Sequence, residues 1–236
     1  MTELPELLLH DDITEVFSGV FSVTGQMPVG PGGAIKISRN MTVVRDGGAL
    51  TLLNTVRLSE EGLAALDALG TVAHVVKLGS FHGRDDAFYT QRYPDATMWA
   101  PPGMPHERGV ATGCELGPGA VPIPGASAFI FETSSLSEAL IVLEREGGIL
   151  IACDSFQNRE TPDHFHSENA MQSAPKLFGR GVIGPGWRNA AKPQASDFER
   201  LAQLPFRHLL SAHGTPLLND ARSVIRARIA EAFGSG

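Results

Sequence analysis

Three apolar runs of this chain are each followed, within a few residues, by side chains that can ionise or bind metals. The first run, residues 72–78, precedes His82 and Asp86, and two later runs precede Asp154 and His213. In α/β proteins, ligands bind in the crevice beyond the carboxyl ends of the strands. The sequence therefore predicts one site at which these four side chains meet.

The composition is that of a globular protein. With 236 residues, 42% hydrophobic and 19% charged, the chain can bury a sizeable core. The formal net charge is −7, and no cluster of Lys and Arg appears along the sequence. A phosphate backbone requires such a cluster, so we expect no nucleic-acid partner.

The sequence also bears on location and redox chemistry. No apolar run approaches the length of a membrane span, and the first residues are acidic where a secretory signal is basic. We therefore expect a cytoplasmic protein without a membrane partner. Cys114 and Cys153 cannot form a disulfide framework and lack the spacing of a thiolate metal site, and Cys153 is predicted to be a buried strand residue.

Apolar spacing and turn signals predict many short strands and a few helices. An amphipathic helix is predicted after Ser59, which has the character of an N-cap, and it should end at Gly70. The early strands should form a meander, and those between residues 126 and 154 a second, antiparallel sheet. Strands are expected over residues 13–22, 34–44, 49–56, 72–78, 96–100, 126–132, 138–143, 148–154 and 206–211, and further helices over 87–92, 168–173, 196–204 and from Asn219 or Asp220 onward.

The segment 155–195 is polar and contains four prolines, so we expect a long excursion over the surface, of the kind that forms functional lids. No internal repeat or low-complexity linker divides the chain. The sequence therefore predicts a single domain over residues 1–236.

Taken together, the strand-end residues resemble the metallo-β-lactamase-fold superfamily over nearly the whole chain. The family's first signature is His-x-His-x-Asp-His, and the same register here reads His82-Gly83-Arg84-Asp85-Asp86-Ala87. The first histidine and the aspartate are present, whereas Arg84 and Ala87 stand at the other two histidine positions. The resemblance implies a four-layer αββα sandwich with two mixed sheets, and a centre of one or two metal ions at its edge.

The family's later ligands are retained in part. A histidine in a Pro-Gly-His-Thr-like turn is missing, because the matching text is Pro124-Gly125-Ala126-Ser127. The bridging aspartate matches Asp154, and the last histidine matches His213 of a His-Gly pair. Residues 93–103 and 154–158 are similar to a branch of the superfamily that also departs from the full ligand set.

One interpretation is a reduced, at most mononuclear metal site. His82, Asp86, Asp154 and His213 offer enough imidazole and carboxylate donors for one Zn²⁺, Fe²⁺ or Mn²⁺ ion. The protein would then hydrolyse a small ester, lactone, amide or thioester. Asp86 would be a ligand or the base, and Arg84 would bind an anionic group of the substrate.

The alternative is a non-catalytic protein that binds a small molecule. Here Arg84 pairs with Asp86 or Asp154 and fills the metal position with a permanent positive charge. Metal content separates the two interpretations. The sequence leaves open the substrate, the metal and whether the chain forms homo-oligomers.

Several other residues are candidates for the same site. His164 and His166 could supply substitute ligands, although two histidines in a polar loop are more often solvated. Asp85 is an alternative acid if the loop is shifted by one residue. Trp99 and Trp187 are predicted to pack or to form a pocket wall.

Overall fold

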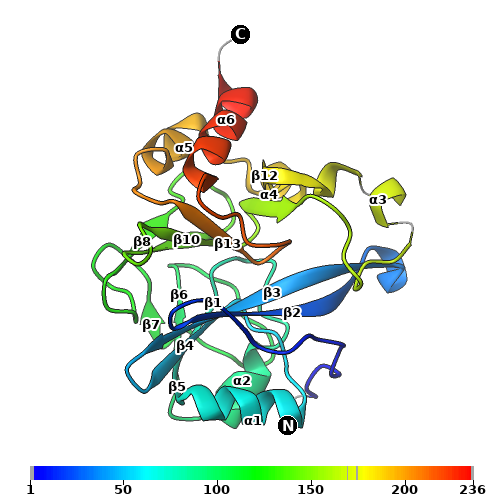
Figure 1. The fold of residues 1–236 in the computed structure, drawn as a ribbon, viewed down its shortest axis with the longest axis vertical. Helices are drawn as coiled ribbons and strands as arrows, with labels where there is room; N and C mark the ends of the chain where they lie inside the picture. The colour runs from blue at the N-terminus through cyan, green and yellow to red at the C-terminus, as the bar shows by residue number, and fades with distance from the viewer. Residues whose placement is uncertain (1–2, 169, 174, 235–236) are drawn as a thin grey trace.

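Two mixed sheets lie face to face in the computed structural model, which describes residues 3–168, 170–173 and 175–234 (Figure 1). The first sheet has seven strands in sequence order. Its pairs are antiparallel up to β4 and parallel from β4 to β7. The strands are β1 (Thr14–Phe17), β2 (Val20–Val29), β3 (Ile35–Asp46), β4 (Ala49–Leu53), β5 (Thr71–Val76), β6 (Thr97–Ala100) and β7 (Cys114–Glu115).

The second sheet has four strands in the order β13-β10-β9-β8. β13 runs parallel to β10, and the other pairs are antiparallel. A short third sheet pairs β11 with β12. These strands are β8 (Ala126–Ile130), β9 (Ala139–Leu143), β10 (Ile149–Ala152), β11 (Phe156–Arg159), β12 (Gly179–Ile183) and β13 (His208–Ser211).

Helices cover both outer faces of the pair of sheets. α1 and α2 lie on the side of the first sheet, and α4, α5 and α6 lie on the side of the second (Figure 1). Among the described residues, no helix is long and apolar enough to cross a membrane. The helices are α1 (Glu60–Leu69), α2 (Asp86–Arg92), α3 (Ala170–Ser173), α4 (Pro185–Ala191), α5 (Ala195–Leu201) and α6 (Ala221–Phe233), with 3-10 turns η1 (Pro31–Gly33) and η2 (Pro175–Leu177).

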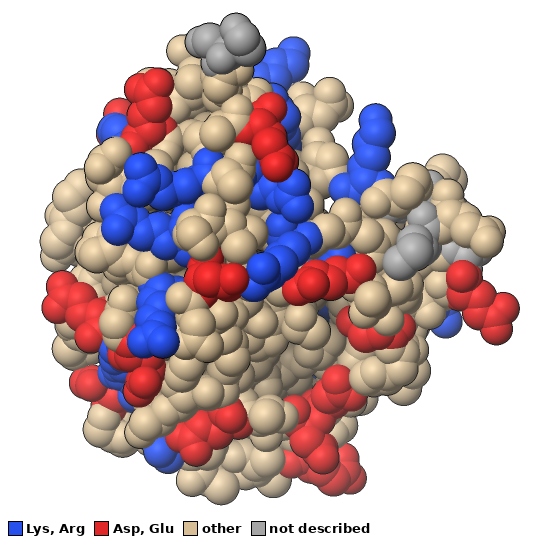
Figure 2. All heavy atoms as spheres, turned by 45° about the horizontal axis from the view of Figure 1, so that its top comes forward, with Lys and Arg blue, Asp and Glu red and all other residues tan. Residues whose placement is uncertain are grey.

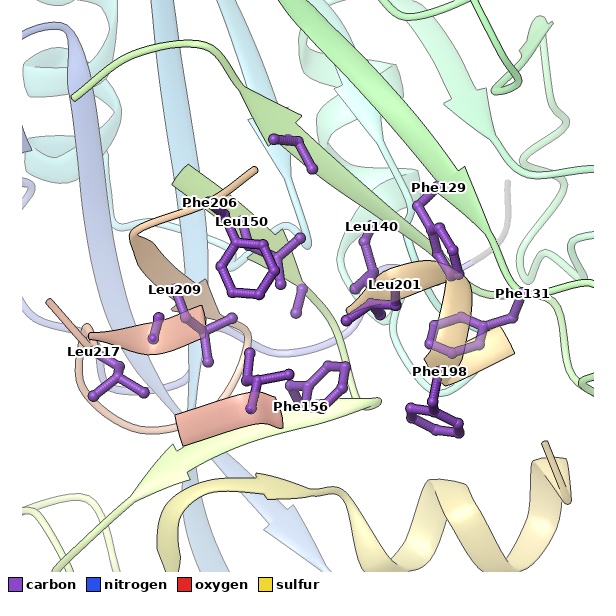
Figure 3. Close-up of a cluster of buried hydrophobic side chains, with 14 of the residues drawn as sticks. Phe129, Phe131, Leu140, Leu150, Phe156, Phe198, Leu201, Phe206, Leu209 and Leu217 are labelled. Atoms are coloured by element: carbon purple, nitrogen blue, oxygen red, sulfur yellow. The ribbon is translucent and has the colours of Figure 1, made fainter. Parts of the chain in front are cut away.

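Three apolar clusters join these four layers. Leu63 and Leu66 of α1 pack with the outer face of the first sheet. A central cluster joins the sheets. A third, between the second sheet and its helices, contains Phe131 and Phe198 (Figure 3) and also Trp187. Each fully buried large side chain contributes about 1.5–3 kcal/mol, so the clusters hold the sandwich together. The arrangement confirms the predicted αββα class with two mixed sheets.

Local signals placed several elements correctly. The Ser59 hydroxyl accepts a hydrogen bond from the Gly62 amide at 3.2 Å, as expected of an N-cap. The strand expected over residues 13–22 is divided, because the chain turns at Gly19, where φ is 70°. Glycine adopts this conformation without steric cost, and the turn joins β1 to β2 as a hairpin.

The segment 155–195 is only in part the surface excursion that its polarity predicted: its middle, from residue 160 to residue 180, is largely exposed or half-buried where it is described, whereas its beginning is buried. All four residues of β11 are buried, and the segment also forms β12 and α4. The helix expected over residues 168–173 covers only 170–173, and residue 169 lies outside the described part of the chain. β11 is buried because its backbone bonds to the chain at His213 and Thr215.

Candidate metal centre

The chain topology brings the ends of three strands together. β10 and β13 are parallel neighbours, with Ala152 opposite Ser211. Asp154 and His213 each follow their strand by two residues, so they leave the sheet side by side. His82 comes from the loop after β5 in the facing sheet.

Three of the four predicted residues meet at one point. The Nε2 atoms of His82 and His213 are 3.2 Å apart. The Asp154 carboxylate lies 3.1 Å from His213 Nε2 and 3.5 Å from His82 Nε2. All three side chains are at most 10% exposed. The structure thus gathers two imidazoles and one carboxylate with their donor atoms facing each other.

The backbone decides which nitrogen of His213 carries its proton. Nδ1 lies 3.1 Å from the Ser38 carbonyl oxygen, which can only accept, so Nδ1 must be protonated. In a neutral ring, Nε2 then presents a lone pair to the Asp154 oxygen, which is also an acceptor. Two acceptors at this distance repel each other unless a cation or a proton lies between them.

Burial keeps both imidazoles neutral at physiological pH. It lowers the pKa of His82 to about 3, and Arg39 and Arg159 oppose its charging further, although Asp154 acts the other way. Burial and Arg159 also lower the pKa of His213. Burial disfavours ionisation of Asp154, but the two histidines outweigh it and lower the pKa of that carboxyl overall. Neutral imidazoles and an ionised carboxylate are the forms that bind metals.

The spacing of the three donors fits one metal ion. Ligand atoms 2.0–2.1 Å from a tetrahedral zinc ion lie roughly 3.4 Å from one another. The three separations here are 3.2, 3.1 and 3.5 Å. The Ser38 carbonyl orients His213 in the way that outer partners orient metal-bound histidines.

A cavity of about 200 Å³ opens above the three residues. One part of its wall is apolar and comes mainly from the hairpin of β2 and β3, and the other part carries two guanidinium groups. The cavity is lined by Met27, Val29, Ile37, Arg39, Phe81, His82, Arg84, Asp154 and His213. A small ligand with an apolar body can therefore reach the donor atoms.

Asp86, the fourth predicted ligand, lies outside this group of donors. It is 2% exposed, and its Oδ1 accepts a hydrogen bond from the Thr55 hydroxyl at 2.7 Å. Burial raises its pKa, while Thr55 and the nearby Lys77 act in the opposite direction. Its role as ligand or base stays a prediction, since the geometry joins it to Thr55 rather than to the histidines.

Arg84 does not take the position expected for it. Instead of pairing with Asp86 or Asp154, it donates to Asp85 Oδ1 at 2.7 Å and to the Glu6 carbonyl at 2.9 Å. Asp85 is fully buried and also pairs with Arg39. The neighbouring acid is the better partner because its charge has no compensation except from these guanidinium groups.

The remaining candidates lie away from the donors. His164 is exposed and pairs with Asp11, and His166 is buried against Asp163 at 2.8 Å. Trp187 belongs to the core beneath α4, as predicted. Trp99 donates its indole N–H to His74 at 3.2 Å.

Three buried residues near the site were missed by sequence reasoning. Arg39 lies in β3, where the polar run Ser38–Asn40 interrupts an apolar strand and was the available signal. Arg159 ends β11 and is 2% exposed. Burial lowers its pKa to about 10, so it remains protonated at neutral pH.

Glu138 is the third, and it supports the chain at Asp154. It is fully buried, and its Oε1 accepts the Ser155 amide at 2.7 Å. Burial raises the pKa of Glu138 and of the Cys153 thiol well above their usual values. These two residues and Asp154 also lie close together, but the raised pKa values of Glu138 and Cys153 disfavour the deprotonated forms that bind metals.

Comparison with known proteins identifies the fold. No protein-family model and no curated protein sequence matches the chain. Among solved structures, DIM-1 metallo-β-lactamase matches with a TM-score of 0.62 and 15% identity, over 98% of this chain and 100% of that chain. A metallo-β-lactamase from Erythrobacter litoralis gives 0.60 and 14%, over 93% and 92% of the two chains. FIM-1 from Pseudomonas aeruginosa, in a mono-zinc form, gives 0.60 and 12%, over 97% and 98%.

The protein therefore has the metallo-β-lactamase fold, as the sequence signature suggested. The likeness spans nearly the whole length of both chains, and three residues that the resemblance marked as ligands meet at the strand ends.

Proposed function

We propose that this protein is a metal-dependent hydrolase of small carbonyl compounds, with one divalent ion held by His82, Asp154 and His213. The observation that carries the proposal is the facing pair of acceptors. His213 Nε2 and the Asp154 oxygen are 3.1 Å apart, and the Ser38 carbonyl fixes the proton of His213 on the other nitrogen. A cation between them removes the repulsion and uses both lone pairs.

The side chains around the centre prepare it for an ion. The Ser38 carbonyl holds the His213 ring in orientation and leaves its Nε2 free of a proton. The low pKa values of both histidines keep the rings neutral, so each has one nitrogen with a lone pair for a metal. A bound ion would polarise a substrate carbonyl and lower the pKa of a water molecule that attacks it. The buried floor of the cavity excludes bulk water and strengthens each electrostatic contact.

The cavity walls suggest how a substrate would be held. Met27, Val29 and Ile37 offer an apolar surface to its body. Arg84 faces the same space with 18% of its side chain exposed, so we assign it the binding of an anionic substrate group. Substrates of this site would be esters, lactones, amides or thioesters small enough for about 200 Å³.

A single ion is favoured over two because the other acids have protein partners. Asp85 is occupied by Arg39 and Arg84. Asp86 bonds to Thr55 and lies near Lys77. A second ion would need several further donors, and the arginines nearby would repel it.

A non-catalytic binding protein is the competing proposal. Its support is the buried positive charge of Arg39 and Arg159, which lower the pKa of His82. These two arginines would supply the positive charge that the sequence had assigned to Arg84. In that case a proton shared by His213 and Asp154, rather than a metal, would separate the two acceptors.

Elemental analysis after reconstitution with Zn²⁺, Mn²⁺ or Fe²⁺ decides between them. We expect about one equivalent of metal in the unmodified protein and under about a tenth in His213→Ala, because a direct ligand is lost. His164→Ala is the matched control, since that exposed histidine lies away from the centre and should leave the metal content unchanged. No metal in the unmodified protein after reconstitution would contradict the hydrolase proposal.

A further inference from the structure

Arg159 is a buried positive charge that forms no ion pair with the described residues. It is 2% exposed, and its Nη1 donates to the Gln157 side chain at 2.7 Å. Its Nε finds no hydrogen-bond partner in the same part of the chain. Within the described residues, no carboxylate oxygen lies within 4.0 Å of its guanidinium group.

Such an arrangement is uncommon, because buried arginines are almost always paired. Arg39 follows the usual pattern, since Asp85 neutralises it. The two acids that act on Arg159 from a distance are already engaged. Asp154 is bonded to His213, and Asp163 accepts from His166 and from the Phe165 amide.

Arg159 is connected to the candidate metal centre through two residues beside it, Gln157 and Asn158. Gln157, its partner, donates to the Asp154 carbonyl at 3.4 Å. The amide of the preceding residue, Asn158, donates to the His213 carbonyl at 3.0 Å. The residues next to Arg159 therefore bond to the backbone of two proposed ligands, Asp154 and His213. The positive charge of Arg159 disfavours protonation of both histidines.

We propose that Arg159 is an electrostatic positioning residue that makes this cavity select ligands with a negative charge, and that it weakens metal binding by the three ligands beside it. The metal part of this inference rests on the proposed function, whereas the anion part does not. The free positive charge favours negative charge in the cavity and opposes a dication.

The cavity narrows the class of ligand to small aliphatic carboxylates and their carbonyl derivatives. Its wall of Met27, Val29, Ile37 and Phe81 suits a short alkyl chain. Arg84 and the field of Arg159 suit a carboxylate. Butanoate, which has both parts, is the probe that we choose.

The anion arm uses metal-free protein and isothermal titration with butanoate. Arg159→Met removes the charge and keeps an unbranched side chain, and it should weaken butanoate binding at least about tenfold, or ~1.4 kcal/mol. Arg159→Lys keeps the charge and should stay within about threefold of the unmodified protein. Losing an unpaired buried charge does not by itself unfold a protein, so both variants are expected to fold.

The metal arm measures the Zn²⁺ dissociation constant by competition with a chelating dye. Arg159→Met should bind Zn²⁺ at least about tenfold more tightly, because Coulombic repulsion is removed. A merely structural role gives the opposite sign, since a disturbed centre binds metal less well. Arg159→Lys should again resemble the unmodified protein.

The outcomes are distinct. Equal butanoate affinity in all three proteins, or equal weakening in both variants, overturns the inference whether or not a metal binds. Weaker Zn²⁺ binding in Arg159→Met overturns the metal part. Failure of the unmodified protein to bind Zn²⁺, Mn²⁺ or Fe²⁺ defeats the proposed function, while the butanoate result still tests the role of Arg159.

Discussion

Two adjacent acids at the start of α2 have opposite electrostatic surroundings. Asp85 Oδ1 accepts a hydrogen bond from Arg84, and Asp85 Oδ2 accepts from Arg39 and from the Arg57 amide. Asp86 has one hydroxyl partner, and its Oδ2 has no hydrogen bond to any described residue. Asp85 therefore lies between two guanidinium groups, whereas burial of Asp86 favours its neutral acid form.

Asp85→Asn should be strongly destabilising. The substitution leaves Arg39 buried without a counter-charge, which costs about 3–5 kcal/mol in comparable cases. Chemical denaturation at pH 7 measures the free energy of unfolding. A loss below about 1 kcal/mol would mean that the Arg39–Asp85 pair does not stabilise the fold.

Asp86→Asn should cost little, because the amide oxygen can still accept from Thr55. The folded pKa of Asp86 is raised, so the folded state holds a proton that the unfolded chain releases above pH 4. Its contribution to stability is complete at low pH and is lost as pH rises through the folded pKa. The variant should show a flatter decline of unfolding free energy above pH 4. Loss of metal in Asp86→Asn would instead establish Asp86 as a ligand.

The three donors show how far the sequence could predict the site. His82, Asp154 and His213 were predicted because each follows an apolar run and each matches a ligand position in the signature of the family that the sequence resembles. Arg39 and Arg159 could not be found in this way. Their position near the site depends on β3 and β11 packing against distant loops, and neither residue follows the end of an apolar run.

The backbone of β11 lies very close to the backbone of the turn after β13. Gly214 follows His213 with φ at 87°, and a Cβ atom there would lie 2.0 Å from the Asn158 carbonyl oxygen. Asn158 belongs to the segment whose polarity predicted a surface excursion. Polarity misled because the segment is held by backbone hydrogen bonds, which composition does not report.

Gly214→Ala should therefore destabilise the protein and disturb His213. Strain at positive φ costs about 1–3 kcal/mol, and the clash with backbone atoms adds to it. Gly186→Ala is the matched control, because it lies within α4 and a Cβ there meets nothing within 4 Å. That variant should be stabilised by up to about 1 kcal/mol. Thermal unfolding of both variants checks the opposite signs, and equal effects would refute the close approach.

Positive and negative side chains are distributed unevenly along the chain. Residues 176–236 contain nine Lys and Arg against four Asp and Glu, whereas residues 1–175 contain ten against 22. The later part supplies α4, α5 and α6, and blue side chains gather over the upper part of Figure 2, towards the end where α5 and α6 lie in Figure 1. The sequence showed no basic cluster because these Lys and Arg residues are separated along the chain. The fold brings their side chains together on one face of the molecule.

Part of this basic surface forms an open hollow of about 570 Å³ between the start of β13 and α6, lined by Arg207, Arg222 and Arg226 with Asn219, Asp220, Ser223 and Phe206. In the described part of the chain, Arg207 and Arg226 pair with no carboxylate. Their free charge should retain the protein on a sulfonate cation exchanger at pH 7 and low salt, even though the net charge is −7.

The double variant Arg207→Gln/Arg226→Gln should lose most of this retention, because it removes two of the three arginine charges of the hollow that pair with no carboxylate of the described residues. Arg92→Gln/Arg108→Gln removes the same net charge from arginines that already have acidic partners, and it should elute close to the unmodified protein. Retention should fall steeply as salt is raised, since exposed charges are screened beyond about 10 Å at 0.1 M. Equal shifts in the two double variants would show that binding to the resin depends on the net charge of the protein, and not on the positive charge gathered in the hollow between β13 and α6.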